Sequence, residues 1–95
     1  MGVRENKVET YLKDEIEKLG GISRKWVSPG FDGVPDQIII LKGVVTFIEV
    51  KTIDGVLSGP QIREHNRLKD NGATVVTLYG KDQVDWYISK IKRFI

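Results

Sequence analysis

An apolar stretch that ends in two charged residues is the feature that most constrains this sequence. Residues 44–51 have the sequence Val-Val-Thr-Phe-Ile-Glu-Val-Lys, which is rich in the β-branched and aromatic residues typical of a buried strand. Side chains alternate between the two faces of a strand, so Glu49 and Lys51 project on the same side. Because charged side chains are seldom buried without a partner, this strand end requires either an ion pair or a chemical role.

A second acid precedes the neighbouring strand. Asp36 follows the turn-forming residues 33–35 and opens a strand expected at residues 36–41. The dipeptide Lys42-Gly43 is a plausible two-residue turn into a strand expected at residues 44–52, which predicts an antiparallel hairpin. Two adjacent strands therefore each offer a carboxylate, and the second strand adds a lysine.

These residue types fit the hydrolysis of a phosphodiester, which needs an activated water and stabilisation of charge on the phosphate and the leaving oxygen. Mg²⁺ supplies such stabilisation, and it needs only one or two carboxylates because it keeps several waters. Asp36 and Glu49 would be its ligands, and the backbone carbonyl of Val50 would offer another oxygen. Lys51 would orient the attacking water or stabilise charge on the phosphate. We expect Mg²⁺ as the cofactor, with Mn²⁺ able to replace it.

Hydrophobic periodicity predicts an α/β domain with the element order αβββαβα, in which helices pack on a mixed sheet. Glycines at positions 20, 21 and 72 end the first two helices. Ser58 and Gln61 resemble a capping box, and Asp82 is expected to cap the last helix. Besides the two strands above, the expected elements are helices at residues 4–19, 60–71 and 82–93 and strands at residues 24–28 and 74–79.

Length and composition limit the class of protein. A chain of 95 residues has room for one domain, expected to span residues 1–95. It has no cysteine, which excludes disulfides and thiolate metal sites. No apolar run approaches the roughly 20 residues that cross a bilayer, and the first residues lack the apolar stretch of a signal peptide. We therefore expect a cytoplasmic protein without a membrane partner, whose net charge of +2 permits a nucleic-acid partner.

The arrangement of these motifs resembles a known nuclease superfamily. Gly33-Val34-Pro35-Asp36 followed by Glu49-Val50-Lys51 is similar to the PD-(D/E)xK signature. The loop Ser28-Pro29-Gly30, an acid on the first helix and Gln61 on the helix after the acidic strand resemble the VRR-NUC branch of that superfamily. The resemblance covers nearly the whole chain and implies a restriction-endonuclease-like central sheet flanked by helices.

The resemblance also implies roles for single residues. Asp36 and Glu49 match the metal ligands, and Lys51 matches the catalytic lysine. Gln61 matches a glutamine expected near that lysine and the attacking water. Stand-alone members of the family resemble Holliday-junction resolvases that act as dimers, which implies a homodimer cutting branched DNA.

The acid on the first helix is open between two residues. Glu9 is the preferred choice, and in related nucleases this acid contacts the metal through water. Glu5 lies one turn earlier on the same helix face and is the alternative. Glu9 is nearly as well explained as a solvated helix residue, and for Glu5 the solvated position is the better explanation.

Several basic residues are candidates for contacts with DNA phosphates. Arg24 and Lys25 lie on an early strand, and Arg63 and Arg67 share one face of the helix at residues 60–71. Such contacts would position a duplex without reading its sequence. The single histidine, His65, is expected to be an ordinary core or surface residue.

Other functions are compatible with the same residues. Within the nucleases, the alternatives are flap-cutting, nicking and restriction-type enzymes. From other classes come a non-catalytic DNA-binding module and a hydrolase that uses the acids as a general acid–base pair without metal. Structural explanations also exist: Glu49 with Lys51 as an ion pair, Asp36 as a turn residue and Gln61 as a helix cap alone.

Overall fold

The computed structural model describes the backbone of residues 3–94 and the side chains of residues 6–94. It confirms the mixed α/β class and the predicted order αβββαβα, followed by one turn of 3₁₀ helix. Its elements are α1 (Val3–Lys18), β1 (Ile22–Lys25), β2 (Gln37–Leu41), β3 (Val44–Lys51), α2 (Gly59–Asp70), β4 (Val75–Tyr79), α3 (Gly80–Ile91) and η1 (Lys92–Phe94).

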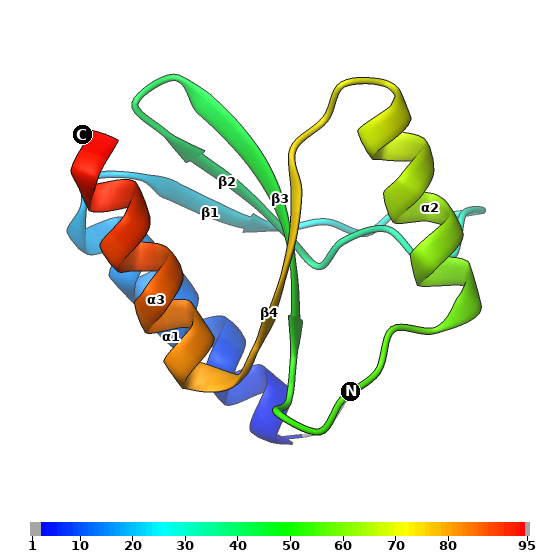
Figure 1. Ribbon diagram of the computed structural model, residues 1–95, viewed down its shortest axis with the longest axis horizontal. Helices are drawn as coiled ribbons and strands as arrows, with labels where there is room; N and C mark the ends of the chain where they lie inside the picture. Colours follow the sequence, from blue (N-terminus) through cyan, green and yellow to red (C-terminus); the bar gives the residue numbers. More distant parts are fainter. Residues whose placement is uncertain (1–2, 95) are drawn as a thin grey trace.

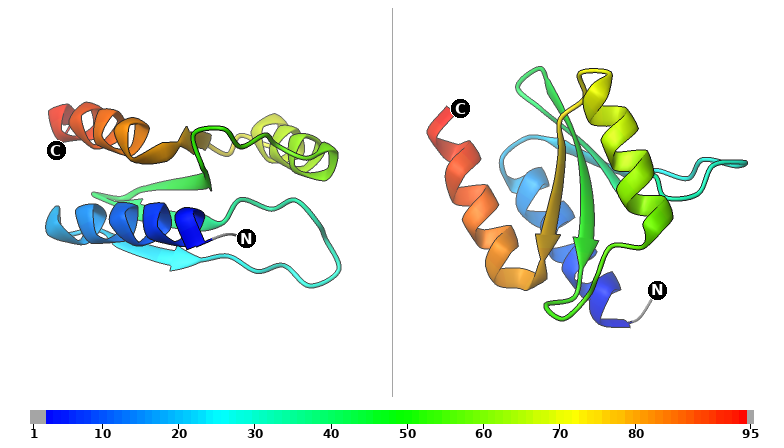
Figure 2. Two further views of the ribbon diagram at one scale, coloured as in Figure 1. Left: turned by 90° about the horizontal axis from the view of Figure 1, so that it is seen from below. Right: turned by 45° about the vertical axis from the view of Figure 1, so that its right-hand side comes forward.

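The four strands form one sheet in the order β1-β2-β3-β4. The first three strands are antiparallel neighbours, whereas β4 runs parallel to β3. A parallel pair requires a crossover connection, and α2 supplies it. Helices α1 and α3 lie together on one face of the sheet, and α2 lies on the opposite face (Figures 1 and 2).

The hydrophobic core lies between the sheet and the pair α1 and α3. Leu12 and Ile16 of α1 are completely buried against Ile48 and Val50 of β3. Burial of each such side chain contributes about 1.5–3 kcal/mol, so this layer supplies most of the stabilisation of the fold. Val8 and Leu19, which continue the helical spacing of Leu12 and Ile16, pack on the same cluster. No helix in residues 3–94 is both long enough and apolar enough to cross a membrane.

The hairpin between β2 and β3 has the predicted two-residue turn. Lys42 and Gly43 have φ values of 51° and 82°, the left-handed conformation that a tight hairpin turn requires at both central positions. This turn fixes the register, in which Gln37 pairs with Ile48. Extending the same register by one residue places Asp36 opposite Glu49.

Two local predictions are wrong. The first strand was expected at residues 24–28, but β1 spans Ile22–Lys25. One further bond in the same register joins Trp26 N to Asp36 O at 2.8 Å, and the chain then leaves the sheet for a turn in which Phe31 N donates to Ser28 O at 3.2 Å. The ring of Trp26 instead packs on Phe47, with the ring centroids 5.2 Å apart. Asp82 does not cap the last helix, since α3 begins at Gly80 and Tyr79 occupies the cap position without a side-chain bond.

The start of α2 is held firmly against the loop that leads to Asp36. The predicted capping box is present: Ser58 Oγ accepts from Gln61 N at 3.2 Å, and Gln61 Oε1 accepts from Ser58 N at 2.9 Å. Gly33 has φ of +91°, and a Cβ at this position would lie 2.3 Å from the carbonyl oxygen of Pro60. Only glycine therefore permits this approach of loop and helix.

We predict that Gly33→Ala destabilises the protein more than Gly30→Ala. Both residues have φ near +90°, so each alanine costs about 1–2 kcal/mol of backbone strain. Space is open around Gly30, whereas at Gly33 the clash with Pro60 should add about 1–3 kcal/mol. Urea unfolding of the two variants measures the difference, and equal free energies of unfolding would contradict the close packing of loop and helix.

Candidate active site

Asp36 and Glu49 are brought together by the pairing of β2 with β3. Val50 N donates to Asp36 Oδ2 at 3.2 Å, which ties the aspartate to the backbone between Glu49 and Lys51. Residues directly opposite each other on antiparallel strands point to the same face, with Cβ atoms about 5 Å apart. Continued by one residue, the register turns the Asp36 side chain toward the sheet face that α2 covers, where Glu49 is only 2% exposed.

Lys51 projects on the same face as Glu49, as the alternation of β3 predicts. It is partly buried at the last position of the strand. The turn that follows closes over its stem, since Gly55 N donates to Thr52 O at 2.9 Å and a Cβ at Gly55 would lie 3.1 Å from Lys51 Cβ. The turn thus restricts the lysine stem on the side of the sheet that carries the carboxylates.

Gln61 has a structural role at the start of α2. Its amide oxygen accepts the backbone N–H of Ser58 in the capping box, so only its NH₂ group is available as a donor to another partner. The residue lines an open hollow of about 520 Å³ between the start of α2 and the loop that carries Phe31 and Gly33. The role of Gln61 beside the lysine and the attacking water stays a prediction.

Glu9 lies on the opposite face of the sheet from Glu49. It points from α1, and its Oε1 accepts from Gln37 Nε2 at 2.8 Å and from Lys25 Nζ at 3.3 Å. Gln37 directly follows Asp36, so Glu9 is connected to the aspartate through a neighbouring residue. The side chain of the alternative acid, Glu5, lies outside the described residues.

His65 is the residue that sequence reasoning missed. Its Nε2 lies 3.6 Å from Glu49 Oε1, and the two side chains are only 3% and 2% exposed. The apolar residues of this helix, Ile62 and Leu68, indicate its inward positions, but Ile62 is 47% exposed and His65 is the buried residue of α2. Because α2 has few apolar residues, its inward face has to include polar ones, and position 65 shares a face with positions 61 and 68.

The surroundings of His65 act on its charge in opposite directions. Burial lowers the pKa of His65, and the positive charge of Lys69 lowers it further. Asp36, a hydrogen bond from the ring to the backbone of Gly33, and Glu64 raise the pKa in part. The ring thus lies within the electrostatic influence of the aspartate as well as beside the glutamate.

The four candidate phosphate-binding residues are all exposed. Lys25 pairs with Glu9, and Arg67 Nη2 lies 2.9 Å from Glu64 Oε1. Arg24 lies on β1, whereas Arg63 and Arg67 lie on α2. The structure places these basic groups at the surface, and their contact with DNA stays a prediction.

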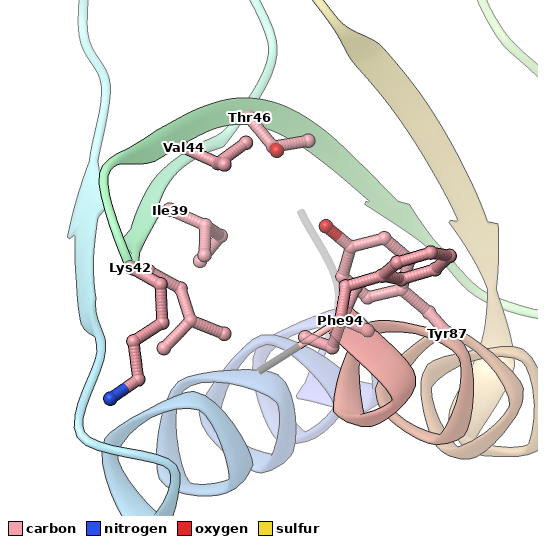
Figure 3. A pocket seen from close by; sticks show the side chains of 8 residues that line it. Ile39, Lys42, Val44, Thr46, Tyr87 and Phe94 are labelled. Atoms are coloured by element: carbon pink, nitrogen blue, oxygen red, sulfur yellow. The ribbon is translucent and has the colours of Figure 1, made fainter.

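A second hollow, of about 260 Å³, lies away from the carboxylates. It is formed by the end of the β2–β3 hairpin together with Tyr87 and Phe94 near the C-terminal end of the chain, and Ile39, Val44 and Thr46 face it (Figure 3). Its lining is largely apolar and contains no acid. Among the side chains of residues 6–94, no group of three or more histidine, cysteine, aspartate and glutamate residues is arranged to hold a metal. A metal site at Asp36 and Glu49 would therefore need backbone or water oxygens as well.

Comparison with known proteins identifies the family. No protein-family model matches the sequence. A phage protein named "Putative nuclease p44", from Acyrthosiphon pisum secondary endosymbiont phage 1, is 41% identical over 81 residues, which cover 84% of this chain and 87% of the relative. A solved "VRR_NUC domain" is 38% identical with a TM-score of 0.86, covering 93% of this chain and 97% of that structure. The chain belongs to the VRR-NUC family.

A more distant structure supports the fold. A solved "VRR_NUC domain protein" has a TM-score of 0.72 at 19% sequence identity and covers the whole of this chain and 90% of that structure. The 38% identical structure confirms the family resemblance, and both structural neighbours confirm the restriction-endonuclease-like fold that the sequence implied.

We predict that Asp36→Ala destabilises this VRR-NUC chain more than Asp36→Asn. Both variants remove the charge, so any relief of repulsion from Glu49 is the same in both. Asparagine keeps an oxygen that accepts from Val50 N, whereas alanine leaves that N–H without its side-chain partner at a cost of about 1–3 kcal/mol. Urea unfolding measures both variants, and equal stabilities would show that the hydrogen bond does not anchor the aspartate.

Proposed function

We propose that this VRR-NUC nuclease is a metal-dependent endodeoxyribonuclease, with residues 1–95 acting as one nuclease domain. The observation that carries the proposal is the pairing of Asp36 with Glu49 across β2 and β3, with Lys51 on the same face. The relative that is named a nuclease supports the same reaction class.

The residues at this site fit a hard divalent cation. Asp36 uses Oδ2 to accept from Val50 N, so its other oxygen can bind a metal. Glu49 is nearly fully buried, and a buried carboxylate beside a second one is unfavourable unless positive charge compensates it. With the carbonyl of Val50 these groups make an oxygen-only donor set, which suits Mg²⁺ and also Mn²⁺. Bound there, Mg²⁺ would stabilise negative charge on the phosphate and on the leaving oxygen.

The side chains around the carboxylates supply positioning and charge. Lys51 would orient the attacking water and stabilise charge on the scissile phosphate. Glu9 hydrogen-bonds Gln37 on the other face of the sheet, and from there it would act on the site by holding the residue after Asp36 in place. The NH₂ group of Gln61 would help to hold the attacking water beside the lysine.

We propose branched DNA, cut by a homodimer, as the substrate. Two copies related by a two-fold axis would present two sites for paired cuts on opposite strands. Arg24, Lys25, Arg63 and Arg67 are exposed and would bind backbone phosphates. Flap, nicked and linear duplexes are the alternative substrates, and a non-catalytic DNA-binding module is the alternative from another class.

We predict that Asp36→Asn and Lys51→Ala each lower the cleavage rate at least about 100-fold, because each removes a group that binds or stabilises the reacting phosphate. DNA affinity, measured by fluorescence anisotropy without metal, should change little. Lys18→Ala is the matched control, since this lysine lies on α1 in an exposed pair with Glu15. Excess chelator should abolish cleavage, and Mg²⁺ or Mn²⁺ should restore it.

Wild-type cleavage rates in either variant would show that the site is assigned to the wrong residues. Full activity in excess chelator would favour general acid–base hydrolysis without metal. If neither cation supports cleavage of any DNA substrate, the non-catalytic module is the better account.

We also predict that a four-way junction is cut faster than flap, nicked or linear duplexes under equal conditions, by paired incisions in opposite strands. A cleavage map with and without Mg²⁺ gives the positions of the cuts, and multi-angle light scattering gives the mass in solution. A monomer across micromolar concentrations, with or without DNA, would contradict paired cutting by a dimer.

A further inference from the structure

His65 lies between the two chain segments that carry the carboxylates. Its Nε2 is 3.6 Å from Glu49 Oε1 of β3. The ring also hydrogen-bonds the backbone of Gly33, three residues before Asp36. Nε2 itself is buried without a hydrogen-bond partner. The ring therefore contacts both the loop that leads to Asp36 and the side chain of Glu49.

Helix α2 is anchored so that His65 cannot easily shift. The capping box of Ser58 and Gln61 fixes the first turn of the helix, and Gly33 packs against the carbonyl of Pro60 without room for a methyl group. His65 stands one turn further along and makes the second attachment of α2 to the same loop. Two attachments one turn apart restrict both translation and rotation of the loop relative to β3.

We propose that His65 is a positioning residue that holds Glu49 and the Asp36 loop at the spacing needed to bind a divalent cation. The ring is too deeply buried to touch DNA, so it acts through Glu49 and the loop. At 3.6 Å the ring orients the carboxylate by packing and polarity, outside the distance of a direct hydrogen bond. The effect on catalysis rests on the proposed function, whereas the effect on metal binding can be measured without any reaction.

The test compares Mn²⁺ binding by the full chain, without DNA, in the wild type and in variants of His65. His65→Leu fills similar volume without polar atoms and should weaken Mn²⁺ affinity about 10- to 100-fold, as loss of a residue that orients a metal ligand does. His65→Gln should recover part of the affinity, because its amide reaches the position of Nε2. In cleavage assays the Leu variant should need more metal and show a lower kcat, while its KM for DNA stays unchanged.

Tyr87→Phe is the control for general loosening of the fold. It removes the hydroxyl that hydrogen-bonds Thr46, a partly buried interaction on the other face of the sheet. This variant should keep wild-type Mn²⁺ affinity. If His65→Leu does not fold, the comparison of His65→Gln with His65→Asn tests the positioning role instead. The asparagine amide reaches only the position of Nδ1, so the Asn variant should bind Mn²⁺ more weakly than the Gln variant.

Wild-type Mn²⁺ affinity in His65→Leu, or equal affinities in the Gln and Asn variants, would overturn the positioning role. So would an equal loss of affinity in Tyr87→Phe. A wild-type protein that binds Mn²⁺ but cuts no DNA would defeat the proposed function and leave the role of His65 supported by the binding data. A wild-type protein that binds no Mn²⁺ would overturn both.

Discussion

The register between β2 and β3 is the constraint on which the candidate site depends. The two-residue turn at Lys42-Gly43 fixes this register, and the hydrogen bond from Val50 N to Asp36 Oδ2 continues it beyond the last paired residue of β2. A slip of one residue would turn every side chain of a strand to the other face. Glu49 would then point into the apolar layer under α1 and α3, and the site would be lost together with the core.

The second constraint is electrostatic. Glu49 is buried beside Asp36 at the end of an otherwise apolar strand, where two like charges destabilise the folded protein unless positive charge compensates them. Lys51 lies on the same face, and His65 meets Glu49 from α2. The two faces of the sheet thus differ in what they bury. The face under α1 and α3 buries apolar side chains, whereas the face that α2 covers buries polar side chains at fixed spacing. Such an arrangement is expected where a binding site has been favoured over stability.

Local sequence signals predicted much of this structure. Periodicity predicted the order of the elements, the hairpin turn predicted that Asp36 and Glu49 come from adjacent strands, and the predicted capping box at Ser58 is present. The errors arose at positions whose burial or orientation is determined by tertiary contacts. His65 is buried because the polar helix α2 has to cover a sheet face, and no local pattern shows which face that is. Helical spacing also could not show on which side of the sheet Glu9 lies, because that depends on how α1 packs, and its role at a metal stays a prediction.

The most direct test of the account is a crystal of the protein grown or soaked with Mn²⁺, with data collected at a wavelength where manganese scatters anomalously. The account predicts an anomalous peak within ligand distance of the carboxylates of Asp36 and Glu49, and its loss in Asp36→Asn at the same Mn²⁺ concentration. A peak held by other residues, or none at millimolar Mn²⁺ in crystals that keep this face open to solvent, would contradict the claim that the two strands form a metal site.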